Sequence, residues 1–413
     1  MHQVHVGSSF PKQGPEGPRV HSLDGGVGMP PRIGRLLLAA CCGALTVLAG
    51  VATAQASPVH GPVVVVSGLN NPRQLSLVHD DVLLIAEAGK GGTIATITSP
   101  EGGTQGLGYT GSVSAVLAPD FAHNQHPLRI VTGLLSAANA ENGPEGPKGG
   151  GATGPDGVSA RSLNRIGVVE TTFGPNTPNA AKPFDGRLLL TTPFGPIRPF
   201  ANITAFEQRH DPDRMGVDSN PYAVLAYRGG WLVADAAGND VLRVDRFGHI
   251  SVFHVFPNVK SGPCATQFDP APPFKGCNFV PTSLATDRWG NVYVGGLSGL
   301  TPGQAQVVKL DNHGRVLKVW NGFTSVTGVA VGDDGSLYVS QLFAPETHPA
   351  NPMIQGVLTG ILGGHRTNVD VPFPAGLAVD HNNVFVSAFS ILPDTGAGIP
   401  GLDTSGQVWR LRF

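Results

Sequence analysis

The chain has 413 residues, and its 57 glycines, 36 prolines and 14% charged residues are typical of many short strands joined by turns. The formal net charge is −2 with no run of lysine or arginine, so the basic stripe that nucleic acid requires is excluded. Hydrophobic residues make up 41% of the chain, which is enough for a large core.

The first 56 residues carry the features of a targeting segment. Residues 1–28 are polar and glycine-rich. We expect either a disordered tail or a start codon assigned too far upstream, with translation truly beginning at Met29. Two arginines precede an apolar run over residues 36–50, and Ala54-Gln55-Ala56 forms a small-x-small site. This pattern predicts a signal peptide over residues 29–56 with cleavage after Ala56. The mature chain is then secreted or held on the cell envelope.

Two other fates for the apolar run stay open. Cys41 lies in a lipoprotein-like context, although only five apolar residues separate it from Arg35. The run is also near the lower length limit for an uncleaved membrane anchor. Free secretion, a lipid anchor and a membrane anchor are therefore all retained, with cleavage after Ala56 as the main prediction.

Residues 57–413 repeat one phrase, and we interpret them as a single domain. The phrase is an apolar strand, a tight turn, a second apolar strand, a loop, and a third strand that alternates apolar and charged residues. Its clearest copy runs from Asp218 to Ile250, and Ile203 to Gln208 precedes it. The second copy is degenerate and is taken to begin at Arg129 to Leu134. The six copies span residues 63–116, 129–191, 218–250, 280–310, 326–358 and 373–411.

The spacing of the copies identifies the architecture. Val224, Leu284, Val329 and Leu377 occupy the same place in their copies and are about 45 to 60 residues apart. Short strands repeating at this period predict an all-β, six-bladed β-propeller. An apolar strand at Val63 to Leu69 precedes the first copy, and we expect it to complete the last blade beside Val408 to Leu411 and close the ring.

Polar residues of the third copy are the candidate metal ligands. In a blade of this topology, the loop that enters the innermost strand and the loop between the second and third strands share one face. That face then gathers oxygen ligands that suit Ca²⁺ or Mg²⁺, with the structural alternative that they cap turns and loops. The predicted set is Glu87, Asp218, Asn220, Asp235, Asn239 and Asp240. Glu87 and Asp235 occupy equivalent places at the ends of second strands.

The two cysteines of the predicted mature chain are Cys264 and Cys277. An isolated pair in an exported protein favours a disulfide, here closing a proline-rich loop. No CxxC motif or matched histidine pair supports zinc. No G-x-S-x-G motif supports a serine hydrolase.

Several motifs give the mature chain a resemblance to a known family. They include Asn71-Pro72-Arg73, Ala86-Glu87-Ala88-Gly89, Gly154-Pro155-Asp156, Asp218-Ser219-Asn220-Pro221-Tyr222 and Ala234-Asp235-Ala236-Ala237-Gly238-Asn239-Asp240. In these motifs the chain resembles the ScyD/ScyE family, over about Val63 to Phe413. The resemblance implies an exported NHL-like propeller and implies no particular activity. The insert from Asn142 to Gly157 departs from the family pattern.

Two kinds of function are compatible with this reading. The first is an exported binding or scaffold propeller, expected to be a monomer, that holds a small molecule, a glycan or an envelope protein at one mouth of the ring. The second is a metal-dependent hydrolase of the gluconolactonase or strictosidine-synthase type, in which Glu87, Asn220 and Asp235 would hold the metal. The sequence leaves open whether the protein is an enzyme.

Overall fold

The structure, a computed structural model, describes residues 60–98, 104–143, 146–174, 177–270, 273–344, 356–396 and 404–413, with side chains from residue 61 and without those of 268–274. The predicted tail, signal peptide and cleavage site lie outside these residues. Among the described residues, no helix combines the length and the apolar character needed to cross a bilayer.

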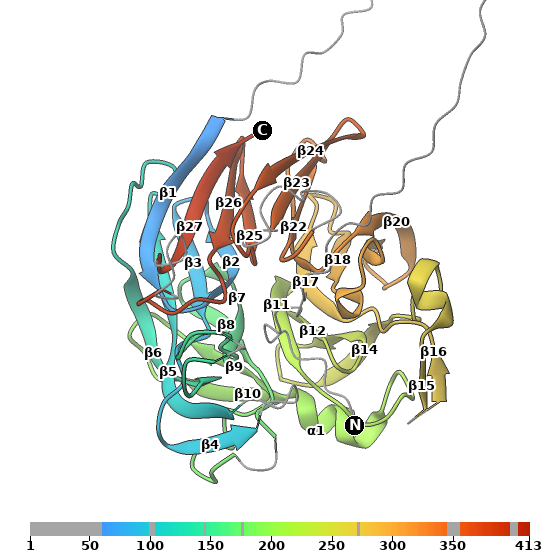
Figure 1. Cartoon of the computed structure of the whole chain (residues 1–413), viewed down its shortest axis with the longest axis horizontal. Helices are drawn as coiled ribbons and strands as arrows, with labels where there is room; N and C mark the ends of the chain where they lie inside the picture. The colour runs from blue at the N-terminus through green and yellow to red at the C-terminus, as the bar shows by residue number, and fades with distance from the viewer. Residues whose placement is uncertain are drawn as a thin grey trace, which may run out of the picture. The chain divides into compact units, whose positions relative to one another are not determined.

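The strands form six antiparallel sheets, each a blade of the predicted six-bladed propeller (Figure 1). Each blade runs outward from an innermost strand. Blade 1 contains β2 (Pro72–Val78), β3 (Val82–Glu87), β5 (Thr104–Leu117) and β6 (Leu128–Asn139), with β4 (Ala95–Thr98) beside β5. Blade 2 contains β7 (Pro155–Ser162), β8 (Arg165–Glu170), β9 (Arg187–Thr191) and β10 (Arg198–Asn202).

The remaining blades follow in chain order. Blade 3 contains β11 (Pro221–Tyr227), β12 (Gly230–Asp235), β13 (Asp240–Val244) and β14 (Ile250–Val255). Blade 4 contains β17 (Pro281–Thr286), β18 (Val292–Gly296), β19 (Ala305–Leu310) and β20 (Val316–Phe323). Blade 5 contains β21 (Val326–Val331), β22 (Leu337–Gln341), β23 (Val357–Leu362) and β24 (His365–Asp370). Blade 6 contains β25 (Leu377–Asp380), β26 (Asn383–Ala388), β27 (Gly406–Arg412) and β1 (His60–Leu69).

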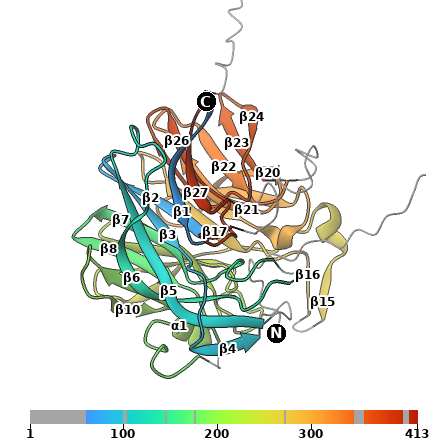
Figure 2. The same cartoon turned by 60° about the vertical axis from the view of Figure 1, so that its left-hand side comes forward.

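The N-terminal strand closes the ring, as the sequence predicted. β1 pairs antiparallel with β27 from His60↔Arg412 to Leu69↔Gly406. Both views show the blue strand beside the red one (Figures 1 and 2). Val65, Val66 and Leu69 are fully buried in one apolar cluster with residues of β26 and β27. Closure therefore joins the two ends of the propeller through burial of apolar surface as well as through backbone hydrogen bonds.

The core consists of apolar layers between neighbouring blades. One cluster holds Leu84 and Val113 of blade 1 against Val158 and Val168 of blade 2. Each innermost strand packs against the next around the ring, and β25 packs against β2. A blade alone would leave both sheet faces exposed to water, and stacking buries them. The innermost strands enclose a channel of about 240 Å³ that is lined by residues of all six blades.

Two faces of the ring are distinguished below. The mouth face carries the loops that enter the innermost strands and those that join second to third strands. The turn face carries the turns between first and second strands and between third and fourth strands. In blade 3, for example, Asp235↔Asp240 lies at the mouth face and Val244↔Ile250 at the turn face.

The structure corrects the second repeat. Residues 129–134 belong to β6, the outermost strand of blade 1, and blade 2 begins only at β7. The long β5 pairs with β3, β4 and β6, so blade 1 uses more chain than a regular repeat would. Ile203 to Gln208, which precedes blade 3, lies in the helix α1 (Ile203–His210).

The predicted disulfide between Cys264 and Cys277 is present. It closes an excursion between blades 3 and 4 that contains a short 3₁₀ helix, Gly262–Thr266, and the hairpin β15 (Phe268–Pro270) and β16 (Pro273–Lys275). A second 3₁₀ turn, Ser298–Leu300, follows β18.

Candidate functional site

The predicted blade 3 residues meet at the mouth face, around the carboxylate of Asp235. This side chain is fully buried at the end of β12 and accepts hydrogen bonds from Ser219 Oγ at 2.6 Å, Asn220 N at 2.6 Å and Gly238 N at 3.2 Å. Asn239 Oδ1 accepts from Val280 N at 2.9 Å and so ties the β12–β13 loop to blade 4. Most of these atoms therefore hold loops in place, which is the structural alternative named from the sequence.

Asp240 is the exception within this predicted set. It is fully buried at the start of β13, and neither carboxylate oxygen has a hydrogen-bonding partner among the described residues. Burial raises the pKa of Asp240 well above its usual value, and the charges of Asp235, Glu207 and Asp213 raise it further. A buried carboxylate in such surroundings is costly unless it holds a proton or a cation.

Helix α1 brings a second buried carboxylate to the same place. Asn202 caps the helix through Oδ1, which accepts from Ala205 N at 2.9 Å, and Asp211 ends it in the left-handed conformation. One turn before that end lies Glu207, fully buried, with both carboxylate oxygens unpartnered among the described residues. Burial raises the pKa of Glu207 to about 9, and its strongest charged neighbours, Asp235 first, are all carboxylates.

A close approach joins α1 to blade 3. A Cβ atom placed on Gly238 would lie 3.3 Å from Glu207 Oε2 and 3.3 Å from the carboxylate carbon of Asp235. The two carboxylates therefore face the same point of the β12–β13 loop, which only glycine leaves free of a side chain.

Glu207 and two acids that follow it in the chain, Asp211 and Asp213, form a group that can hold a metal ion. One carboxylate oxygen from each of Glu207, Asp211 and Asp213 lies within 4.8 Å of the others. Asp211 and Asp213 are half-buried, and burial raises the pKa of Asp213 to about 6. We call Glu207, Asp211, Asp213 and Asp240 the acidic cluster.

The sequence reading missed three members of the acidic cluster. Glu207 lies in the segment Ile203 to Gln208, for which the sequence pattern predicts no helix and which forms most of α1. Asp211, Asp213 and Asp218 stand close together in Asp211-Pro212-Asp213-Arg214-Met215-Gly216-Val217-Asp218. That density of acids directly before a blade was the signal that could have found them. Asp218 lies near enough to raise the pKa of Glu207.

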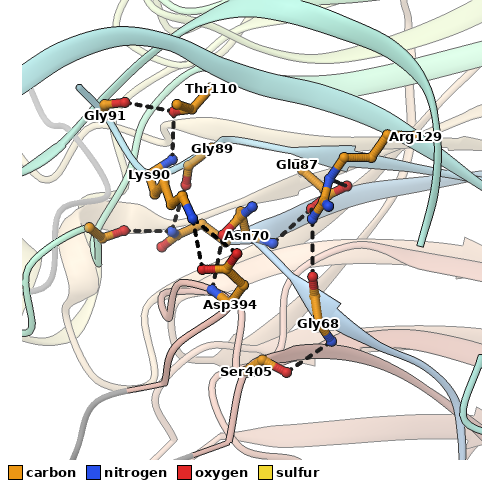
Figure 3. A network of polar contacts seen from close by, with 12 residues as sticks. Gly68, Asn70, Glu87, Gly89, Lys90, Gly91, Thr110, Arg129, Asp394 and Ser405 are labelled. Atoms are coloured by element: carbon orange, nitrogen blue, oxygen red, sulfur yellow. Dashed lines mark hydrogen bonds and ion pairs between the residues drawn. The ribbon is translucent and has the colours of Figure 1, made fainter. Parts of the chain in front are cut away.

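Glu87 has a different environment from the acidic cluster. Its oxygens accept from Asn70 N at 2.8 Å, Ser112 Oγ at 3.1 Å and Ser114 Oγ at 2.5 Å. The Arg129 guanidinium reaches both oxygens, at 2.9 and 3.1 Å, and also donates to the carbonyl of Gly68 (Figure 3). Glu87 as a metal ligand stays a prediction, and an ion there would have to displace these partners.

A third buried acidic group lies at the entrance to blade 2. Arg73 donates to Asp156 Oδ1 at 3.2 Å and to the carbonyls of Ser390 and Ala152. Arg73 and all three of these partners are buried. Burial raises the pKa of Asp156 to about 7 against the opposing charge of Arg73. Nearby Glu170 is fully buried with both oxygens unpartnered among the described residues, and burial raises its pKa well above the usual value.

The mouth face also carries an open groove of about 540 Å³ between blades 1 and 6. Its lining includes Lys90, Thr110, Lys148 and Asp394 together with glycine backbone. Lys90 Nζ pairs with Asp394 at 3.0 Å, and Asp394 N donates to Asn70 Oδ1 at 2.9 Å (Figure 3). The groove therefore offers both charges and exposed backbone groups to a polar ligand.

Fold and site together define a six-bladed propeller with an acidic cluster and a polar groove on one face. No family model matches the sequence, and no curated protein matches it. Solved structures with a similar fold include a streptogramin B lyase, with a TM-score of 0.44 and 10% identity over 86% of this chain and 97% of that one.

Two other solved structures with a similar fold are named as enzymes. A PQQ-bound aldose sugar dehydrogenase from Streptomyces coelicolor has a TM-score of 0.44 and 14% identity, over 86% of this chain and 97% of that one. A gluconolactonase from Xanthomonas campestris has a TM-score of 0.43 and 9% identity, over 86% and 95%. Structural similarity at such low sequence identity shows the fold alone.

Proposed function

We propose that the protein is an exported binding propeller that holds one divalent cation, Ca²⁺ in preference to Mg²⁺, in the acidic cluster. The observation that carries this proposal is the pair of fully buried carboxylates, Glu207 and Asp240, whose oxygens have no hydrogen-bonding partner in the part of the chain that the structure describes. We also propose that it belongs to the ScyD/ScyE family, that it is secreted or held on the cell envelope, and that it acts as a monomer.

The chemistry of the ligands favours calcium. Every candidate ligand atom is a carboxylate oxygen, and several belong to buried side chains. Ca²⁺ accepts six to eight oxygen ligands in flexible geometry, whereas Mg²⁺ demands a near-ideal octahedron and keeps several waters. A cation also removes the cost of burying like charges side by side, because it replaces the protons that Glu207 and Asp240 otherwise retain.

The ligand of the binding protein would lie in the groove of the mouth face. A small polar molecule or a glycan fits the lining, because Lys90, Lys148, Asp394 and Thr110 present hydrogen-bonding groups of both kinds. The cation would stabilise the fold between blades 2 and 3 of the same face.

A metal-dependent hydrolase is the second candidate. Asp211 and Asp213 are only half-buried, so an ion bound there could keep an open position for water or a carbonyl oxygen. Turnover of lactones or esters that is lost with the cation would favour this candidate over the binding protein.

Calorimetric titration of Ca²⁺ and Mg²⁺ tests the cation site. The experiment uses the chain from Ser57 after chelator treatment, because that chain contains every strand of the ring. We expect one Ca²⁺ per chain, tighter than Mg²⁺. Glu207→Gln and Asp240→Asn should each weaken binding about tenfold or more.

The matched control is Asp394→Asn, which removes a half-buried carboxylate on the same face and should leave Ca²⁺ affinity unchanged. An absence of binding would refute the proposal. Loss of binding in Glu87→Gln but not in Glu207→Gln would place the ion at the ligand set that the sequence predicted around Glu87.

A further inference from the structure

Two turns of the turn face share the pattern Asp-Arg-aromatic-Gly. They are Asp245-Arg246-Phe247-Gly248 in blade 3 and Asp287-Arg288-Trp289-Gly290 in blade 4. They lie at the ends of the strands opposite to the acidic cluster, next to Val244↔Ile250 and Thr286↔Val292.

The first and last residues of each turn are sufficient to form it. Asp245 Oδ1 accepts from Phe247 N at 2.8 Å and His249 N at 2.9 Å, and Asp287 Oδ1 accepts from Trp289 N at 3.0 Å and Asn291 N at 2.9 Å. Gly248 and Gly290 supply positive φ values of 89° and 82°. The side chains of the arginine and the aromatic residue between them make none of these hydrogen bonds.

Those middle residues project into solvent as paired units. Phe247 is 67% exposed and Trp289 is 61% exposed. The Arg246 guanidinium lies 4.6 Å from the ring centroid of Phe247, and that of Arg288 lies 4.4 Å from the ring centroid of Trp289. Each turn thus presents a large apolar ring next to a permanent positive charge.

The two turns stand on neighbouring blades of the same face, and Arg228 lies in a third turn of that face. The hydroxyl of Tyr227 donates to the carbonyl of Gly290 at 2.8 Å, which places Arg228 beside the blade 4 turn. Asp287 pairs with Lys309 at 2.9 Å, so Arg228, Arg246 and Arg288 outnumber the one remaining carboxylate of the two turns, that of Asp245. We define the basic-aromatic patch as Arg228, Arg246, Phe247, Arg288 and Trp289.

The turns of two other blades carry acidic pairs instead. The corresponding turns of blade 1 and blade 5 carry the exposed pairs Asp80-Asp81 and Asp333-Asp334. The most exposed aromatic residue of the chain's described part, Phe121 at 84%, follows Asp120 in a blade 1 turn whose Ala118 donates to the carbonyl of Asp81. Blades 1 and 5 therefore carry acidic turns, whereas blades 3 and 4, like blade 2 with its exposed Arg161 and Arg165, carry basic ones that suit an anionic partner.

We propose that the basic-aromatic patch docks the protein on an anionic phospholipid bilayer. Its side chains stand on separate turns of two blades, and neither the groove nor the channel is lined by Phe247 or Trp289. Such an arrangement suits an extended surface better than a small molecule. Aromatic rings partition to the bilayer interface, and arginines are attracted to anionic headgroups. Docking through this patch leaves the mouth face turned away from the lipid.

Vesicle co-sedimentation tests the proposal with the chain from Ser57, which lacks the apolar run of residues 36–50. We expect binding to vesicles of phosphatidylglycerol and phosphatidylcholine, little binding to phosphatidylcholine alone, and loss of binding at high salt. Arg246→Ala with Arg288→Ala should weaken binding about 25-fold, at roughly fivefold for each arginine. Phe247→Ser with Trp289→Ser should weaken it about tenfold or more, and Trp289→Phe should remove most of the blue shift in tryptophan fluorescence on binding.

Phe121→Ser is the matched control, because it removes an equally exposed ring on the acidic side and should leave binding within about twofold of the parent chain. Circular dichroism checks that each variant is folded. Equal binding to neutral vesicles, no binding, or unchanged binding of the patch variants would overturn the proposal. Binding to soluble dextran sulfate without binding to vesicles would also overturn it, and would assign the patch to an acidic polysaccharide.

Discussion

In four blades, the residue at the end of the second strand shows how one position can serve different purposes. Glu87, Glu170, Asp235 and Gln341 all pair with the first residue of their innermost strand. In blades 1, 3 and 5 this side chain accepts a backbone N–H from the entering loop, at 2.6 to 2.8 Å. The equivalence of Glu87 and Asp235 expected from the sequence is therefore real, and it includes a common structural task. Glu170 has the same position without such a partner.

This difference predicts opposite effects of the same substitution. Glu87→Gln should lower the free energy of unfolding by about 2 kcal/mol, because the Arg129 guanidinium loses its charged partner. Glu170→Gln should raise the stability at pH 8, because it removes an acid that the fold forces to stay protonated. Urea unfolding of both variants measures the two changes.

The effect of Glu170→Gln should depend on pH with a definite sign. The pKa of Glu170 is raised in the folded state, so between about pH 4.5 and that raised value the folded chain binds more protons than the unfolded chain. Stability of the parent chain therefore falls as pH rises through this window. The gain from Glu170→Gln should be absent at pH 4 and grow toward pH 8. A gain that is the same at both pH values would contradict this account.

At the scale of single elements, the strands were predictable and the insertions were not. The four anchor residues of the repeat all lie in innermost strands, as expected: Val224, Leu284, Val329 and Leu377. Such strands can be predicted because the pattern of apolar residues and turn residues marks them directly in the sequence. Helix α1 is short and lies between two blades, and its buried residues are too few to impose a clear helical period. Glu207 was missed for this reason, and with it most of the acidic cluster.

The disulfide excursion between blades 3 and 4 makes a prediction at this scale. Cys264 and Cys277 are buried beside Val259, and the bond closes a loop with a sequence separation of 13. Removing it through Cys264→Ser with Cys277→Ser should lower the free energy of unfolding by about 3 kcal/mol, the value for a loop of this length. Urea unfolding of the parent chain with and without dithiothreitol should give the same difference. The double variant should not respond to the reductant, and an equal response from both would contradict the assignment.

At the scale of the whole molecule, six copies of one phrase were enough to predict the ring and its closure. The copies need not be alike, because the number of blades follows from the number of innermost strands. The degenerate second copy shows the limit of locating blades from sequence repeats alone. Residues 129–134 contain the apolar residues of an ordinary strand, and the pairing of β6 with the long β5 assigns them to blade 1.

Closure by β1 is testable by removing it. A chain that begins at Asn70 lacks the partner of β27 and exposes the apolar side of blade 6, including Phe385 and Val408. We expect this chain to bind a hydrophobic dye and to lose cooperative unfolding, whereas the chain from Ser57 unfolds in one step. A cooperative transition of equal midpoint in both chains would show that closure does not hold the ring together.

The pairing of β1 with β27 also sets an order of events during synthesis. His60 pairs with Arg412, so β1, which leaves the ribosome before the other described strands, has to wait for one of the last before it can pair. Blades 1 to 5 can form in turn from neighbouring segments, while the sixth joins residues from the two ends of the propeller. The seam is therefore the slowest contact to form, since it spans the longest stretch of chain. Until the seam forms, β27 has an unpaired edge that can pair with the β1 strand of another incompletely folded chain. We therefore expect misassembly to be most frequent when many nascent chains are close together.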